Sequence, residues 1–224
     1  MPDAARVPAW SAVLWDLDGT LVDSIGLIVQ SYQHAFTAVL GHGWDEAEIR
    51  SWIGQSLIGS MRKASPDHAD EIFAAYHEWN NANTERLLRV IPGIPALLGA
   101  LTAAGVRGGV VTSKREGPAH WALRLAGIDD AVPLLVSHDD VDEHKPSPKP
   151  LLLGASRLGT EPGRCVYIGD SPVDIVAAHN AGAVGIGVTW GAATRAELAD
   201  ASPLAIVDDA AELAHLLGVI LPLD

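Results

Sequence analysis

The apolar residues of this chain gather in short, almost unbroken runs separated by longer mixed stretches. Such runs are typical of strands buried on both faces of a parallel sheet, because neither face of the strand meets water. The predicted strands are 12–15, 106–111, 132–136, 166–168 and 184–188, with 204–207 as a candidate sixth.

Helical patterns fill most of the stretches between these strands, and each ends beside a glycine, a common stop signal for a helix. The predicted helices are 95–104, 117–126, 148–158 and 172–181. Strands that alternate with helices of this length indicate βαβ units. We therefore expect an α/β fold with a doubly wound, mostly parallel sheet and a Rossmann-like core.

The alternation fails in one part of the chain, which has helical patterns but no comparable strand pattern. These helical stretches are 27–40, 46–53, 56–63 and 68–88. The simplest explanation is an all-helical cap domain inserted after the first strand, over residues 24–90. Residues 1–23 and 91–224 then form the α/β core, and Gly93, between two prolines, marks the return to it.

Composition supports a globular protein, with 48% hydrophobic and 19% charged residues. The formal net charge of −13 repels the phosphates of nucleic acids, so we expect no nucleic-acid partner. The same charge repels a small phosphate ester. A site that handles phosphate would need local positive charge from a metal ion, a lysine and backbone N–H groups.

Neither a membrane span nor a signal peptide is visible in the sequence. No apolar stretch reaches the roughly 18 residues of a transmembrane helix, and residues 1–8 lack an apolar core. The single cysteine, Cys165, lies in an apolar run and is expected to be a buried core residue. We expect a cytoplasmic protein with no membrane partner, either a monomer or a homodimer.

Polar residues that could take part in catalysis or ligand binding follow four of the predicted strands. They are, in chain order, Asp16 and Asp18, Thr112 and Ser113, Lys145, and Asp170 and Asp174. In an open α/β sheet, ligands bind beyond the carboxyl ends of the strands. These residues are therefore expected to meet at one edge of the sheet.

The residue types in this set favour phosphoryl transfer with a metal ion. Four aspartates in one crevice repel one another unless a cation is present, and Mg²⁺ prefers carboxylate oxygens and water. Lys145 adds a positive charge, and Thr112 and Ser113 add hydrogen-bond donors for the oxygens of a phosphoryl group. Each feature alone is common in ordinary loops, and only their combination is informative.

This combination resembles the motifs of the haloacid dehalogenase superfamily. Residues 15–24, WDLDGTLVDS, are similar to its first motif, and Trp15 stands where the family usually has phenylalanine. Thr112, Lys145 and the segment 169–174 resemble the second, third and fourth motifs. The resemblance covers essentially the whole chain.

Two further segments, 147–159 and 188–191, resemble the phosphoglycolate-phosphatase-like subgroup of that family. The helical block matches the position of the subgroup's mobile cap. The resemblance therefore implies a phosphatase that acts on a small phosphorylated metabolite.

The resemblance also implies roles for the four aspartates. Asp16 would be the nucleophile and a metal ligand. Asp18 would protonate the leaving oxygen and then activate water, while its backbone carbonyl binds the metal. Asp170 would bind Mg²⁺, and Asp174 would bind it directly or through water.

The remaining motif residues would hold the transferring group. By the same resemblance, Thr112 and the N–H of Ser113 would bind the phosphoryl oxygens. Lys145 would neutralise both Asp16 and the phosphate.

Hydrolysis has three alternatives within this superfamily: dehalogenation, phosphomutase activity and a non-catalytic binding role. Dehalogenases of the superfamily lack the second aspartate, which is present here as Asp18. Sugar-phosphate phosphomutases use both aspartates but carry basic residues in the cap, whereas the loop 53–57 has none. A non-catalytic binding module usually lacks a motif residue, and none is missing here.

Substrate choice must come from the cap, because the core motifs contact only the phosphoryl group. In the resembled subgroup the equivalent loop points at the leaving group, which implies Gln55 and Ser56 as candidates for leaving-group contacts. The segment could equally be a helix–helix turn with Gly54 as the helix stop and Ser56 as an N-cap. Phosphoglycolate is the first candidate substrate by resemblance. Pyrophosphate, nucleoside monophosphates and sugar phosphates remain open.

The acidic and imidazole residues from His138 to His144 look like a metal cluster but lack the regular spacing of one. We expect this segment to be a solvated loop.

Overall fold

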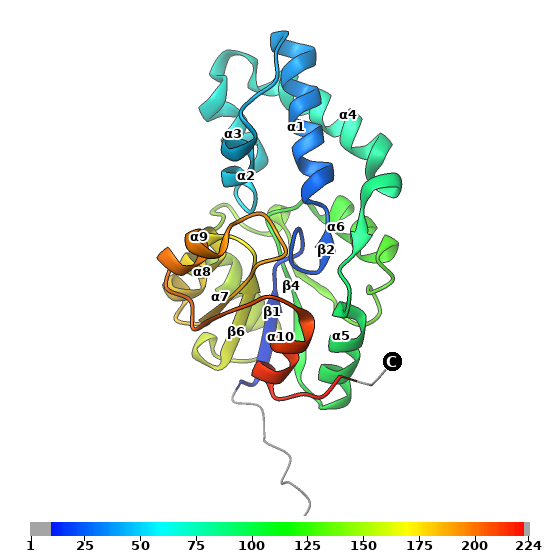
Figure 1. Cartoon of the computed structure of the whole chain (residues 1–224). Coiled ribbons are helices and arrows are strands. Elements are labelled where there is room, and N and C mark those ends of the chain that lie inside the picture. Colours follow the sequence, from blue (N-terminus) through cyan, green and yellow to red (C-terminus); the bar gives the residue numbers. More distant parts are fainter. Residues whose placement is uncertain (1–9, 222–224) are drawn as a thin grey trace, which may run out of the picture.

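The computed structural model describes residues 10–221 and contains one six-stranded sheet in the order β5-β4-β1-β6-β7-β8 (Figure 1). Every neighbouring pair of its strands is parallel. The strands are β1 (Ala12–Trp15), β4 (Arg107–Val111), β5 (Leu134–Val136), β6 (Cys165–Gly169), β7 (Val184–Val188) and β8 (Ala205–Val207). The predicted α/β fold class is confirmed, and the candidate sixth strand is present.

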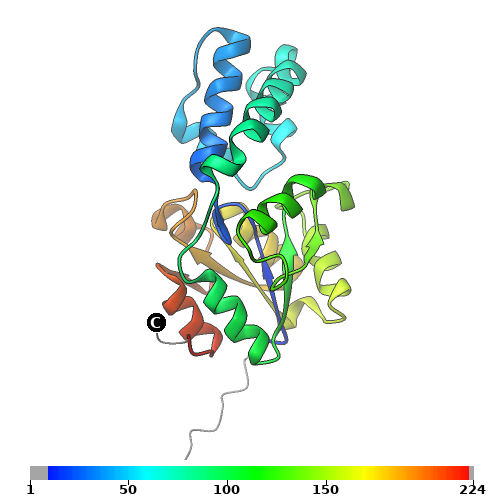
Figure 2. The ribbon, with the colours of Figure 1, turned by 90° about the vertical axis from the view of Figure 1, so that its right-hand side faces the viewer.

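Helices cover both faces of the sheet (Figure 2). Val13 and Trp15 of β1 pack into the cluster that includes α5, α6 and α10, whereas Ala12 and Leu14 pack with α7 and α8 on the opposite face. This alternation is the two-residue period of a strand. The helices are α5 (Ile94–Ala103), α6 (Glu116–Leu125), α7 (Lys149–Arg157), α8 (Pro172–Ala181), α9 (Arg195–Asp200) and α10 (Ala210–Leu217).

The first strand lies at the centre of the sheet, between β4 and β6. Trp15 pairs with Val110 on one side and with Ile168 on the other. Strands that follow β1 in the sequence therefore lie on both sides of it. The carboxyl end of β1 is then the topological switch point, where ligands bind in sheets of this kind.

Four helices form a separate layer beyond that end of the sheet (Figure 1). They are α1 (Ile25–Leu40), α2 (Glu46–Trp52), α3 (Leu57–Ala64) and α4 (Ala69–Leu87). We call this layer the cap. It has its own apolar cluster, in which the Tyr32 ring lies 5.0 Å from that of Tyr76 and 5.5 Å from that of Trp52.

A short antiparallel ribbon joins the cap to the core. Its two strands, β2 (Val22–Asp23) and β3 (Arg89–Val90), are the points where the chain leaves the sheet layer and returns. Gly93 lies slightly later, at the N-cap of α5, with a φ of 79°. The division into domains at residues 24 and 90 stays a prediction.

The other differences from the expected elements are local. Strand β5 begins at Leu134, after Pro133, because proline has no N–H to donate to a sheet. The sequence patterns did not predict α9, α10 or the short 3₁₀ helices η1 (Pro66–His68), η2 (His138–Asp140) and η3 (Pro162–Arg164). Cys165 is fully buried, as expected. Within residues 10–221, every helix is too short or too polar to cross a membrane.

Candidate active site

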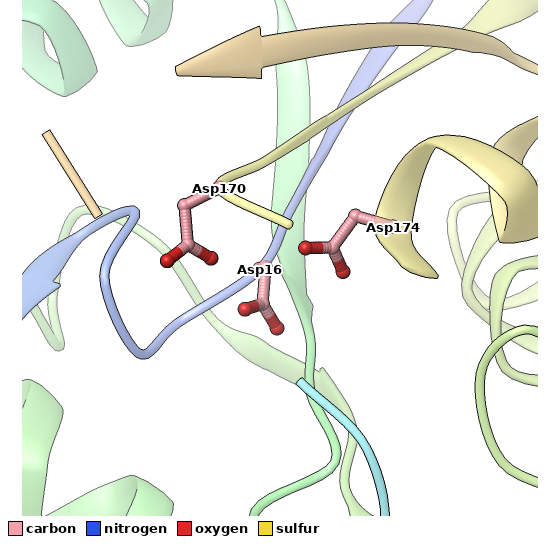
Figure 3. A group of neighbouring side chains, drawn as sticks. All are labelled: Asp16, Asp170 and Asp174. Carbon is pink, nitrogen blue, oxygen red and sulfur yellow. The ribbon is translucent and has the colours of Figure 1, made fainter. Parts of the chain in front are cut away.

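Three aspartates meet at the carboxyl end of the sheet (Figure 3). Asp16 follows β1, Asp170 follows β6, and Asp174 lies in the first turn of α8. One carboxylate oxygen from each lies within 4.8 Å of the others, and all three residues are buried. Among the residues that the structure describes, these three aspartates form the group of acidic, histidine or cysteine side chains that could hold a metal ion.

Two glycines allow the backbone to approach Asp170 closely. A Cβ on either Gly19 or Gly191 would collide with the Asp170 carboxylate. Gly19 also has a φ of 78°, a conformation that other residues adopt at a cost. The glycine of the first motif therefore leaves room for a carboxylate that arrives from another strand.

Lys145 joins two of the aspartates. Its Nζ donates to Asp16 Oδ1 at 2.8 Å, to Asp174 Oδ1 at 2.6 Å and to the hydroxyl of Tyr167 at 3.1 Å. The Tyr167 hydroxyl in turn donates to the backbone carbonyl of Val111 at 2.8 Å. All three N–H bonds of this buried ammonium are thus used, and the lysine position is fixed from three sides.

Asp174 and Asp170 differ in how many hydrogen bonds they accept. Asp174 Oδ2 accepts from the N–H and the hydroxyl of Ser171, so both of its oxygens are occupied. Asp170 Oδ2 accepts from the N–H of Ala192 at 2.6 Å. Asp170 Oδ1 is buried and has no hydrogen-bond partner. A buried carboxylate oxygen without a hydrogen-bond partner is suited to bind a cation.

Burial makes these charges costly. Desolvation raises the pKa of Asp16 to about 7; Lys145 opposes this rise and Asp174 adds to it. Desolvation also raises the pKa of Asp170 well above its ordinary range, with added repulsion from Asp174 and Asp16. Desolvation lowers the pKa of Lys145, but the Asp16 and Asp174 carboxylates outweigh it and raise that pKa. The site has more negative charge than its lysine can neutralise, which favours a bound cation.

Asp18 has different partners from the other aspartates. Its carboxylate accepts from the Ser24 hydroxyl at 2.7 Å and from Lys114 Nζ at 2.9 Å and 3.0 Å. These contacts hold its side chain at the wall of the cavity described below. Asp16 and Asp18 therefore share one site but lie in different electrostatic surroundings.

Thr112 and Ser113 follow β4 and lie beside the aspartates. Thr112 is buried, and its Oγ1 accepts from the N–H of Lys114 at 3.1 Å. The Ser113 hydroxyl donates to the Gly54 carbonyl of the cap at 2.8 Å. This contact joins the cap directly to the strand end.

A cavity of about 350 Å³ lies between the cap and these strand ends. Asp16, Asp18, Thr112 and Ser113 line its core side. Gln55 lines its cap side, and its side-chain amide donates to the Ser51 carbonyl at 2.8 Å. The lining does not include Ser56, which lies at the N-cap position of α3.

The family model for haloacid dehalogenase-like hydrolases matches residues 13–188. This span includes every motif residue of the site. The chain belongs to the haloacid dehalogenase-like hydrolases.

Relatives and solved structures agree with this membership. Pyrophosphatase PpaX of Bacillus velezensis is 31% identical over 209 residues, covering 93% of this chain and 97% of the relative. A hydrolase from Pseudomonas syringae superposes with a TM-score of 0.84 at 25% identity, covering 92% of this chain and 97% of that one. A predicted phosphoglycolate phosphatase from Haemophilus somnus superposes with a TM-score of 0.80 at 27% identity, covering 92% and 98%.

Three side chains of this hydrolase's site had no role in the sequence analysis, namely Ser24, Lys114 and Tyr167. Lys114 directly follows two motif residues, and that adjacency was the available signal. Tyr167 lies inside an apolar run, where a tyrosine is indistinguishable from a core residue. The segment from His138 to His144 contributes no group to the metal cluster in the part of the hydrolase that the structure describes.

Proposed function

We propose that this hydrolase is a Mg²⁺-dependent phosphatase that cleaves a small phosphate monoester through an aspartyl-phosphate on Asp16. The observation that carries the proposal is the buried cluster of Asp16, Asp170 and Asp174 beside Lys145. This cluster supports the proposal because it brings the Asp16 carboxylate together with two further buried carboxylates and a fixed ammonium. The alternative of a non-catalytic module would not require this set.

The residues fit a magnesium ion. Asp16 and the unpartnered Oδ1 of Asp170 are the candidate protein ligands, together with the backbone carbonyl of Asp18. Asp174 already accepts hydrogen bonds at both oxygens, so we propose that it contacts the ion through water. When bound, Mg²⁺ supplies positive charge that offsets carboxylate repulsion and the charge of the phosphoryl oxygens.

The two aspartates of the first motif divide the chemistry. An Asp16 oxygen forms a bond to phosphorus as the bond to the leaving oxygen breaks, and protonated Asp18 gives its proton to that oxygen. Asp18, now ionised, takes a proton from water while the water oxygen bonds to phosphorus and the bond between phosphorus and the Asp16 oxygen breaks. Inorganic phosphate leaves, and both carboxyl groups return to their initial states.

Core residues hold the transferring group during both steps. Thr112 and the N–H of Ser113 are proposed to donate to phosphoryl oxygens, and Lys145 to neutralise charge on Asp16 and the phosphate. Lys145 is already fixed by Tyr167 and Asp174, so little rearrangement is needed. Fixed donors in a buried site stabilise charge more than mobile donors in water.

The names of similar proteins suggest two substrates for this chain. One is pyrophosphate, from the Bacillus velezensis relative, and the other is phosphoglycolate, from the Haemophilus somnus structure and the sequence resemblance. We propose a small phosphorylated metabolite as the substrate class, in a cytoplasmic protein that is a monomer or a homodimer. Nucleic acid is not proposed as a partner.

The test is release of inorganic phosphate from a panel of phosphate esters, with Mg²⁺ and with a chelator. Asp16→Asn should abolish turnover and leave the circular dichroism spectrum unchanged. If no ester is hydrolysed with Mg²⁺, or if Asp16→Asn keeps wild-type turnover, the proposal is wrong. Isomerisation of a sugar phosphate without phosphate release would favour a phosphomutase instead.

A further inference from the structure

The cavity has two chemically different sides. Its floor is the core side, with the aspartates and the residues after β4. Its roof is the cap side, formed by α1, the end of α2 and the loop after it, α3 and α4. The transferring phosphoryl group belongs on the floor, so the rest of the substrate must lie against the roof.

The roof is mostly apolar and aromatic. Tyr32 from α1, Trp52 from α2, Leu57 and Ile58 from α3, and Phe73 and Tyr76 from α4 all line it. Leu57, Ile58 and Phe73 are only partly buried, so parts of these side chains remain uncovered by protein. Such a lining favours an apolar ligand body.

The two cations that line the floor are each paired with a carboxylate. Lys114 Nζ donates to both oxygens of Asp18, and Arg115 Nε donates to Asp139 Oδ1 at 3.0 Å. Within residues 10–221 these are the only lysine and arginine among the lining residues. An anionic group on the substrate would therefore compete with Asp18 or Asp139 for these cations.

The ionisable groups of the roof also disfavour an anion. Asp70 contributes a carboxylate to the lining. Desolvation lowers the pKa of His77, and Arg115 and Lys114 lower it further, which disfavours the charged imidazolium. On the core side, desolvation also lowers the pKa of His138, although Asp139 opposes the shift. Among the described residues, the roof thus offers no lysine or arginine to a carboxylate or a second phosphate.

We infer that the substrate is the monophosphate of an uncharged alcohol with an apolar body, rather than phosphoglycolate or pyrophosphate. This inference rests on the proposed phosphatase function and names the leaving group of that reaction. The cavity volume of about 350 Å³ falls within the range of pockets that enclose organic ligands, about 300–1,000 Å³. Glycolate or a second phosphate would leave most of the apolar roof without contact.

The experiment compares n-alkyl phosphates from ethyl to hexyl with phosphoglycolate and pyrophosphate, all with Mg²⁺. The leaving-group acidity is nearly constant along the alkyl series, so kcat/KM reports contacts with the roof. We expect kcat/KM to rise by up to about fourfold for each methylene that becomes buried. Hexyl phosphate should exceed both anionic substrates.

A matched pair of variants on α4 locates the effect. Phe73→Ala removes a ring from the roof and should flatten the dependence on chain length. Trp79→Ala removes a ring from the same helix that packs on His34, with centroids 5.9 Å apart, and does not line the cavity. This control should keep the wild-type slope, and thermal melts of both variants check folding.

A second arm measures binding without turnover. Calorimetry with Asp16→Asn should show affinity that increases with alkyl chain length and a negative heat-capacity change, the signature of apolar burial. A flat series, or preference for phosphoglycolate or pyrophosphate, overturns the inference while phosphate release still supports the phosphatase. If no ester is hydrolysed, the phosphatase proposal fails, and length-independent binding to Asp16→Asn then overturns the inference as well.

Discussion

Lys114 Nζ lies 2.9 Å and 3.0 Å from the two carboxylate oxygens of Asp18, although 96 positions separate the residues in the chain. The Ser24 hydroxyl donates to the same carboxylate. Two donors from different elements thus orient the side chain that is proposed to move protons. Asp16, in contrast, is paired with Lys145 at the metal cluster.

Lys114→Met should therefore impair proton transfer more than binding. We expect kcat for an alkyl phosphate to fall about tenfold, because general acid–base catalysis contributes about 10²–10⁴-fold and depends on position. An aryl phosphate, whose leaving group needs little protonation, should lose less. Steady-state kinetics on both esters measure the difference, and Lys114→Arg should restore part of it. An equal loss on both esters would argue against this role.

The Lys114–Asp18 pair shows what sequence patterns can and cannot reveal. The strands were predictable because buried parallel strands are continuous apolar runs, and the motif residues follow strand ends. The pairing of Lys114 with Asp18 depends on β1 and β4 lying side by side, which no local pattern encodes. The β2–β3 ribbon was missed for a simpler reason, since strands of two residues produce no visible periodicity.

Magnesium should stabilise the fold more strongly at higher pH. Without metal, a carboxyl group whose pKa is raised from 3.8 to about 7, as at Asp16, destabilises the folded state as pH rises through that interval. Metal binding requires the ionised form, so the Kd for Mg²⁺ should fall between about pH 6 and pH 8. The increase in Tm caused by Mg²⁺ should therefore be larger at pH 8 than at pH 6.

Differential scanning fluorimetry with and without Mg²⁺ measures this shift. Asp170→Asn removes a proposed ligand and one of the repelling charges. That variant should lose most of the Mg²⁺-dependent increase in Tm and should melt no lower than the wild type in a chelator at pH 8. A Mg²⁺ effect that is equal at both pH values, or unchanged in Asp170→Asn, would contradict the assigned cluster.

Tyr167→Phe should destabilise the fold through Lys145. The variant removes the hydroxyl that accepts from Lys145 Nζ and donates to the Val111 carbonyl, and all of these groups are buried. An unsatisfied buried polar group costs about 1–3 kcal/mol, so the free energy of unfolding should decrease by about that amount. Urea denaturation measures it. An unchanged midpoint would show that the hydroxyl does not hold the lysine.

The loop between α2 and α3, which contains Gly54, was expected from the sequence only as a possible turn between two helices. Gly54 has a φ of 88°, and a Cβ there would lie 2.8 Å from Ser171 Oγ and 3.0 Å from Val173 Cγ1 of the core. Its carbonyl accepts from Ser113. The loop therefore sits against the core at a separation that only glycine permits. The contact was not predictable, because its partners Ser113, Ser171 and Val173 lie far from Gly54 in the sequence, after β4 and β6.

Gly54→Ala should separate the loop from the core and weaken catalysis. Gly41 provides a matched control, because it has a φ of 79° at the end of α1, but a Cβ at this position would have no neighbouring atom within 4 Å. Both substitutions carry the strain of a left-handed residue, about 1–2 kcal/mol, and should lower Tm to a similar degree. Only Gly54→Ala also meets Ser171 and Val173.

We expect kcat/KM to fall about tenfold to hundredfold in Gly54→Ala and to change little in Gly41→Ala, since small displacements of a closing element misplace the substrate. Kinetics and melting curves on the two variants provide the comparison. If both lose activity equally, the effect comes from cap stability alone. If neither loses activity, the contact between the Gly54 loop and the core is not needed for turnover.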